Sequence, residues 1–127
     1  MDKKAQTSKI FVIKTDKIIK QFTSTDIVYI ECDTSVCDVY FADGDKFACV
    51  RPLKYFEENL ADLNFVRINH NALVNIYYIK EIKCIAPKKK KIVLKDNKEL
   101  DISYRKWSII KAKINEHCSI ASWRTYK

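Results

Sequence analysis

The side chains best suited to binding chemistry lie in one stretch, which reads FVRINHNALVN. Because side chains alternate along an extended strand, Val66 and Ile68 would face one side of it, and Arg67, Asn69 and Asn71 the other. A strand that only needs to be solvated more often carries lysine, glutamate or threonine outward. Guanidinium and carboxamide groups instead hydrogen-bond to base edges and phosphates, so this row predicts contact with a nucleic acid.

The same stretch is predicted to bend. Leu73 and Val74 interrupt the alternation, and Asn75 follows them. Asparagine favours turns because its side chain can hydrogen-bond nearby backbone, and Asn75 is interpreted as structural. His70 has the same parity as Ile68, so a buried, hydrogen-bonded histidine is favoured over a base-reading one. We therefore expect a strand, a bend and a second strand, with polar groups near the bend.

Spaced residues in this part of the chain also form a signature. They are Phe65-Val66-Arg67, His70, Leu73-Val74-Asn75 and Tyr78-Ile79. The series resembles that of the LytTR-type DNA-binding domain of bacterial transcription regulators. The resemblance covers residues 10–114, with the elements in the family's order. It implies a mostly β domain that presents loops and turns, rather than a recognition helix, to the DNA major groove.

Length and composition fit a single domain. The chain has 127 residues, of which 47% are hydrophobic and 31% charged, an ordinary balance for a globular protein. The predicted organisation is a polar tail over residues 1–8, a domain over 9–116 and a second tail over 117–127. No apolar run is long enough to cross a membrane and no secretory segment follows the first methionine, so a cytoplasmic location is expected.

The charge points to a polyanionic partner. The formal net charge is +8, and residues 87–113 hold ten of the basic residues against three acidic ones. A lysine-rich surface that is merely solvated is the alternative, and for any single lysine it is the better interpretation. Charge bears on association and solubility rather than on fold.

The cysteines predict neither a disulfide framework nor a metal site. There are five, an odd number, and no pair has the C-x-x-C spacing. The two histidines are not close to a cysteine pair in the sequence. Reduced thiols are therefore expected, with no metal or cofactor.

Short strands separated by turns dominate the first half of the chain. Residues 10–13 and 18–22 predict a hairpin, residues 27–31 a buried strand, and Asp43-Gly44 the turn of a further hairpin. After Pro52, apolar residues at 53, 56 and 60 recur at helical spacing, which predicts a short helix with Glu57 facing outward.

The second half continues with strands and closes on a helix. Residues 77–85 and 92–94 are strand-like and are separated by a break at Pro87 and the four lysines after it. Ser103 is a good N-cap for a helix from Tyr104 toward Glu116, with Ile102 and Trp107 spaced for a hydrophobic staple. The predicted fold is mainly β, with about nine or ten short strands in an antiparallel meander, a short central helix and a C-terminal helix.

The resemblance to LytTR domains implies three DNA-contacting surfaces. Carried onto this sequence, they contain Ser35, Cys37 and Asp38; then Arg67, His70 and Asn71; and finally Arg105 and Lys106. Asparagine pairs well with adenine and arginine with guanine, while an aspartate would have to accept from a cytosine amine. The resemblance also implies two copies on paired direct repeats of double-stranded DNA, with a homodimer on DNA as a further expectation.

Two other functions compete with specific DNA binding. One is a protein-interaction or antirepressor module that keeps the fold without binding an operator, and the other is single-stranded nucleic-acid binding by exposed aromatic residues. An enzyme is not predicted, because the residues assemble no catalytic triad, phosphate loop or metal cluster. No phosphorylation receiver domain fits in the remaining residues, so regulation is expected from a partner, from expression level or from a missing portion.

Overall fold

The computed structural model describes residues 8–14, 17–61 and 63–117, apart from the side chain of His117. This part of the chain forms ten strands, two α-helices and three single turns of 3-10 helix. The elements are β1 (Ile10–Lys14), β2 (Ile19–Thr23), η1 (Ser24–Asp26), β3 (Ile27–Asp33), β4 (Val36–Phe41), β5 (Lys46–Cys49), α1 (Leu53–Asn59), β6 (Phe65–Asn69), β7 (Ala72–Asn75), η2 (Ile76–Tyr78), β8 (Ile79–Ala86), β9 (Lys89–Leu94), β10 (Glu99–Ile102), η3 (Tyr104–Lys106) and α2 (Trp107–His117). The predicted class and number of strands are confirmed. The two predicted tails lie almost wholly outside the described residues.

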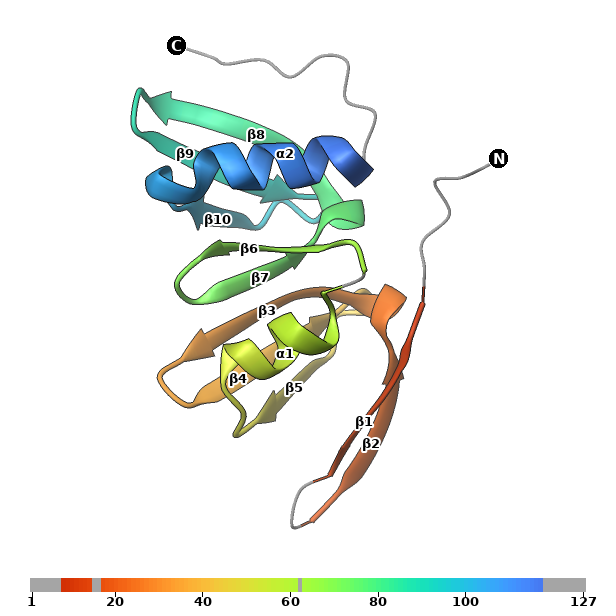
Figure 1. Cartoon of the computed structure of the whole chain (residues 1–127). Helices are drawn as coiled ribbons and strands as arrows, with labels where there is room; N and C mark the ends of the chain where they lie inside the picture. Colours follow the sequence, from red (N-terminus) through yellow and green to blue (C-terminus); the bar gives the residue numbers. More distant parts are fainter. Residues whose placement is uncertain (1–7, 15–16, 62, 118–127) are drawn as a thin grey trace, which may run out of the picture.

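The strands form three antiparallel sheets (Figure 1). A five-stranded sheet has the order β5-β4-β3-β7-β6, a three-stranded sheet the order β10-β9-β8, and β1 pairs with β2 alone. Strands that are neighbours within a sheet are consecutive in the chain and form hairpins, except β3 and β7, whose pairing brings the two halves of the central sheet together. Figure 1 shows α1 over the central sheet and α2 across the three-stranded sheet.

Each face of the central sheet carries its own core. On one face, Leu53, Phe56 and Leu60 of the α1 region pack with the inner face of the β1–β2 hairpin. On the other, Ile110 and Ile114 of α2 pack with β6, β7 and the three-stranded sheet. Because β7 is covered on both faces, all four of its residues are buried, which explains its unbroken apolar run.

The chain reverses direction earlier than the sequence suggested. The turn between β6 and β7 falls at His70-Asn71, not at Leu73–Asn75. Asn75 is nevertheless structural, as interpreted. It is fully buried, its Nδ2 donates to the Ile27 oxygen at 2.9 Å, and its Oδ1 accepts from the Tyr77 amide at 3.0 Å.

Two local predictions in the second half of the chain were wrong in detail. The four lysines do not all form a break, because Lys89 already begins β9 and the connection is the short Pro87-Lys88 turn. Ser103 does occupy the N-cap position of the first helical turn, as predicted, but its side chain makes no capping hydrogen bond. Its amide instead donates to the Ile68 oxygen at 2.7 Å, so backbone pairing with β6 fixes the start of the C-terminal helical segment. No helix in the described ranges is long and apolar enough to span a membrane.

Candidate nucleic-acid interface

Three connections open toward the same side of the molecule, the left side in Figure 1. They are the β3–β4 turn, the β6–β7 turn and the η3 segment that leads into α2. Backbone and side-chain hydrogen bonds join them. The Cys32 amide donates to the Asn71 oxygen at 2.8 Å, and Asn69 Nδ2 donates to the Asp101 oxygen at 2.7 Å. The structure therefore gathers the three surfaces that the sequence placed far apart.

The β6–β7 turn presents His70 and Asn71 to solvent. The expectation that His70 is buried is wrong, because β6 ends at Asn69 and its register shifts after Arg67, so strand parity does not extend to the turn. Within the turn, Asn69 Oδ1 accepts from the Asn71 amide at 2.6 Å. A hydrogen bond inside the turn thus fixes the backbone that carries the exposed His70 and Asn71 side chains.

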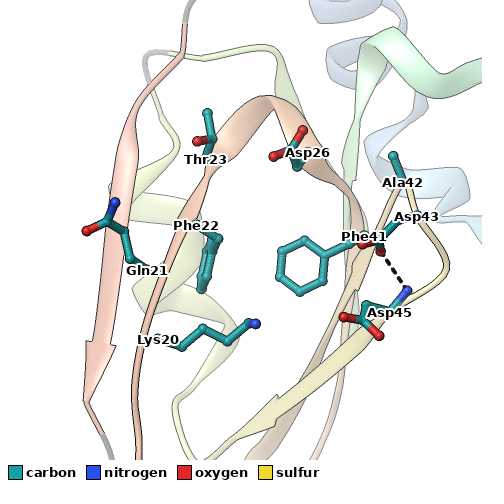
Figure 2. A pocket seen from close by; sticks show the side chains of 9 residues that line it. All are labelled: Lys20, Gln21, Phe22, Thr23, Asp26, Phe41, Ala42, Asp43 and Asp45. Carbon is teal, nitrogen blue, oxygen red and sulfur yellow. Dashed lines mark hydrogen bonds between the residues drawn. The ribbon is translucent and has the colours of Figure 1, made fainter.

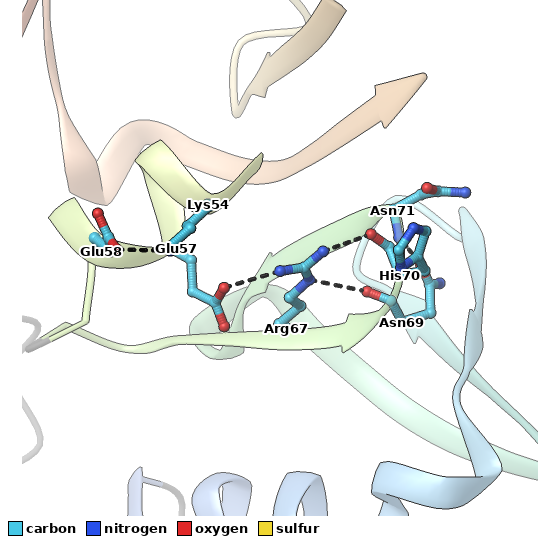
Figure 3. Close-up of polar contacts among 7 residues, drawn as sticks. All are labelled: Lys54, Glu57, Glu58, Arg67, Asn69, His70 and Asn71. Carbon is cyan, nitrogen blue, oxygen red and sulfur yellow. Dashed lines mark hydrogen bonds and ion pairs between the residues drawn. The ribbon is translucent and has the colours of Figure 1, made fainter. Parts of the chain in front are cut away.

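Arg67 lies between Glu57 and this turn and makes hydrogen bonds to the turn backbone (Figure 3). Its Nη1 pairs with Glu57 Oε1 at 2.9 Å, and its Nη2 donates to the His70 oxygen at 2.7 Å. Its Nε reaches the Asn69 oxygen at 3.4 Å. The side chain is only 22% exposed. With its donors directed at protein groups, Arg67 is placed to position the turn rather than to reach a ligand.

The β3–β4 turn differs from the predicted contact surface. Ser35 is exposed, whereas Cys37 has no exposed surface, so the Cys37 side chain cannot touch DNA. The reason is the alternation of β4, which begins at Val36 and turns that residue outward and the next inward. Asp38 is half-buried and lies opposite Glu31 in the ladder.

Three cysteines lie side by side beneath this turn. Cys37 pairs in register with Cys32 on one side and Cys49 on the other, and all three are buried and free. The Cys37 thiol donates to the Arg51 oxygen at 3.0 Å. Burial raises the pKa of the Cys37 and Cys49 thiols. Within the described ranges, no three His, Cys, Asp or Glu side chains are placed to hold a metal ion.

The η3 segment presents Arg105 and Lys106, both exposed. The Lys106 amide donates to the Ser103 oxygen at 3.1 Å, which closes the 3-10 turn. A hollow of about 410 Å³ lies between the β6–β7 turn and β10. Its lining includes His70, Asn71 and Ser103, together with the lysines Lys91 and Lys98 and the carboxylates of Glu31, Glu99 and Asp101. Ser103, which directly precedes the η3 segment, is the lining residue that brings this hollow next to that segment.

A second hollow, of about 420 Å³, lies beside the N-terminal hairpin (Figure 2). Its lining includes Asp26, Asp43 and Asp45 against the single cation Lys20. The Asp45 amide donates to Asp43 Oδ1 at 2.9 Å. Three carboxylates make this hollow unfavourable for a polyanion.

Sequence reasoning missed two supporting residues. Glu57 was expected to face outward, but it pairs with Arg67 across ten residues of chain, which the helical pattern alone does not reveal. Asn69 was recognised as polar without the bridge that it makes to β10. The sequence gives one signal for this bridging role of Asn69. The residue lies on the polar face of the predicted strand, two residues before Asn71.

Comparison with known proteins agrees with this fold. The family model described as "LytTr DNA-binding domain" matches residues 8–115. Among solved structures, the chain is similar to the LytTr DNA-binding domain of a Bacillus cereus protein described as a methyl-accepting/DNA response regulator. The TM-score is 0.71 at 18% identity, with 83% of this chain and 95% of that chain covered. At this identity the likeness shows the fold. No curated protein matches the chain.

Proposed function

Since the chain belongs to the LytTR family of DNA-binding domains, we propose that it recognises a specific sequence in double-stranded DNA and thereby regulates transcription. Family membership itself makes it a DNA-binding domain of a kind found in transcription regulators, not a member of an enzyme family. The proposal adds sequence specificity and a mode of reading. In that mode, the β6–β7 turn and the η3 segment enter the major groove.

The observation that carries the proposal is the braced β6–β7 turn. His70 and Asn71 are exposed at its tip, while the side chains of Arg67 and Asn69 hydrogen-bond to its backbone. Preorganised donors and acceptors lose little conformational entropy on binding, which favours discrimination between bases. A two-residue turn is also narrow enough for a major groove about 12 Å wide.

Each exposed side chain has a chemical role in this proposal. The Asn71 carboxamide can pair bidentately with adenine and the Arg105 guanidinium with guanine, each worth about 1–3 kcal/mol of discrimination. His70 is the third base-reading candidate because its ring stands beside Asn71 at the tip (Figure 3). Lys106 is suited to a phosphate and Ser35 to a flanking base or phosphate, whereas the Asp38 carboxylate, which repels phosphate, is suited only to a cytosine amine. Neither Cys37 nor Arg67 is given a contact with DNA.

Two copies on paired direct repeats complete the proposal. A single small domain that presents two narrow segments reads few base pairs, so a second bound copy would lengthen the recognised sequence. Linking two weak binding events on one DNA molecule raises the apparent affinity without any new contact to bases. A homodimer that forms on DNA is the corresponding assembly.

Selection from a random duplex pool tests the proposal. The wild-type protein is expected to enrich a repeated sequence, and Asn71→Ala, Arg105→Ala and His70→Ala each to lose preference at a defined base. Lys54→Ala is the control, because the Lys54 side chain is 75% exposed on α1 and pairs with Glu58, one turn further along the same helix (Figure 3). Binding without any enriched sequence would contradict specific readout.

A protein-interaction module is the second candidate, and one observation favours it. The outer face of the β1–β2 hairpin exposes Ile10, Val12 and Ile19, at 64%, 54% and 67%, although Phe11 and Phe22 already fill its inner face. An apolar patch of this kind often marks a protein contact. If no duplex is enriched, this face becomes the leading candidate for function.

A further inference from the structure

The lysine quartet at residues 88–91 is divided between two faces of the three-stranded sheet. Lys89 and Lys91 have the parity of the outer face and Lys90 that of the face covered by α2, while Lys88 lies in the turn before β9. On the outer face, two lysines are paired with carboxylates of β10. Lys83 Nζ lies 2.8 Å from Glu99 Oε2, and Lys91 Nζ lies 2.9 Å from Asp101 Oδ1.

On the other face the lysines stand beside the η3 segment instead. The Lys88 Nζ lies 5.5 Å from the centre of the Tyr104 ring, and the Lys90 Nζ lies 5.3 Å from that of Trp107. These contacts hold both stems against the start of α2, where Arg105 and Lys106 are exposed. Among the described residues, none of these four cations forms an ion pair with a carboxylate.

We propose that Lys88 and Lys90, held over Tyr104 and Trp107, form a phosphate-binding surface that extends the DNA footprint beyond the base-reading turns. This inference rests on the proposed function and adds to it a contact with the DNA backbone. The β8–β9 turn lies on the same side as the β6–β7 turn and the start of α2 (Figure 1). A duplex seated on the reading turns can therefore continue over this corner.

The physical reason lies in which cations are already neutralised. A lysine that is paired with a carboxylate must give up that pair before it can bind a phosphate, whereas an unpaired one gains directly. Lysines resting on aromatic rings are also positioned, and the contact through the ring face leaves the ammonium open to a second partner. Of the four lysines, Lys88 and Lys90 meet both conditions. The sequence alone therefore overestimates how many lysines of this run are suited to bind phosphate.

A pair of double variants tests the inference. Lys88→Gln/Lys90→Gln removes two charges from the proposed surface, and Lys83→Gln/Lys89→Gln removes the same charge from the opposite face of the same hairpin. Affinity for the selected duplex and for a shuffled duplex is measured by fluorescence anisotropy over a series of salt concentrations. Each phosphate contact contributes about 0.9 to the slope of log affinity against log salt.

Lys88→Gln/Lys90→Gln is expected to weaken binding to both duplexes by a similar factor and to reduce the salt slope by about 2. Lys83→Gln/Lys89→Gln should change the slope by less than half as much. Equal reductions in the two doubles, or no reduction in the first, would overturn the inference, as would a changed base preference in the first. The slope also guards against partial unfolding, because a smaller folded fraction lowers affinity at every salt concentration alike.

The same measurements separate this inference from the proposed function. If the wild-type protein enriches no sequence but the two doubles still differ in slope, specific recognition fails and the phosphate surface stands. If a sequence is enriched and the doubles do not differ, the phosphate surface fails alone.

Discussion

The guanidinium of Arg67 donates to the backbone oxygen of His70 at 2.7 Å, and this contact makes Arg67 part of the support of the β6–β7 turn. The same guanidinium pairs with Glu57 on α1. Arg67 thereby connects α1, which packs against one face of the central sheet, to the turn at the C-terminal end of β6. The position of the exposed His70 and Asn71 side chains depends on a residue that need not touch DNA.

Replacing Arg67 by glutamine is expected to weaken DNA binding about tenfold and to lower the free energy of unfolding by about 1–2 kcal/mol. The loss follows because the His70 and Asn69 oxygens lose a charged donor and the turn gains freedom. The salt slope of DNA binding should stay at the wild-type value, since no phosphate contact is removed. Anisotropy and urea unfolding measure these quantities.

Glu57→Gln is the matched control for that variant. It removes the ion pair with Arg67 but leaves the hydrogen bond from Arg67 to the turn, so DNA affinity should change much less. A shallower salt slope in Arg67→Gln would show instead that Arg67 contacts a phosphate, as the sequence alone suggested.

Two asparagines in the same hairpin should separate binding from stability. Asn75→Ala leaves the buried Ile27 oxygen and Tyr77 amide without their side-chain partner and is expected to cost about 2–4 kcal/mol of unfolding free energy. Asn71→Ala, at an exposed tip, should cost under about 0.5 kcal/mol while reducing specific DNA binding. The urea midpoint and the selected duplex measure the two effects. Similar stability losses in both would contradict this division.

Regular alternation was enough to predict most of the strands, but it failed where strands end. The N-terminal hairpin, the turn at Asp43-Gly44 and the helix after Pro52 depend on local signals, and each of them forms. His70 was misplaced because parity was continued past the last residue of β6. The apolar run of β7 was taken for a bend because its second covered face comes from α2, which is distant in sequence.

The site residues show the same division between local and distant causes. The exposure of Asn71 and Arg105 agrees with their expected place on the surface. Cys37 was assigned from the resemblance to a family loop, and only the starting point of β4 shows that it points inward. The pairing of Arg67 with Glu57 depends on how α1 packs beside β6, which no pattern within either element reports.

Backbone strain in the β3–β4 turn gives a further prediction. Thr34 has a φ of 58°, a left-handed conformation that costs a β-branched residue about 1–2 kcal/mol. Thr34→Gly should therefore raise the free energy of unfolding by up to about 1 kcal/mol, after the greater entropy of glycine in the unfolded chain is subtracted. In Ser35→Gly, where φ is not positive, the same entropy should lower stability by about 0.5–1 kcal/mol. Urea unfolding of both variants checks the opposite signs.

The buried thiols predict a loss of stability in alkaline solution. Burial raises the pKa of Cys37 and Cys49, whereas in the unfolded chain a thiol ionises near pH 8.5. The stabilisation is therefore fully present below that pH and is lost as the pH rises above it, because only the unfolded state then releases the proton. Urea unfolding at neutral and alkaline pH should show this fall, and Cys37→Ala should reduce its steepness. An unchanged pH dependence in Cys37→Ala would mean that other groups, such as the buried Tyr29, whose pKa is also raised by burial, account for the effect.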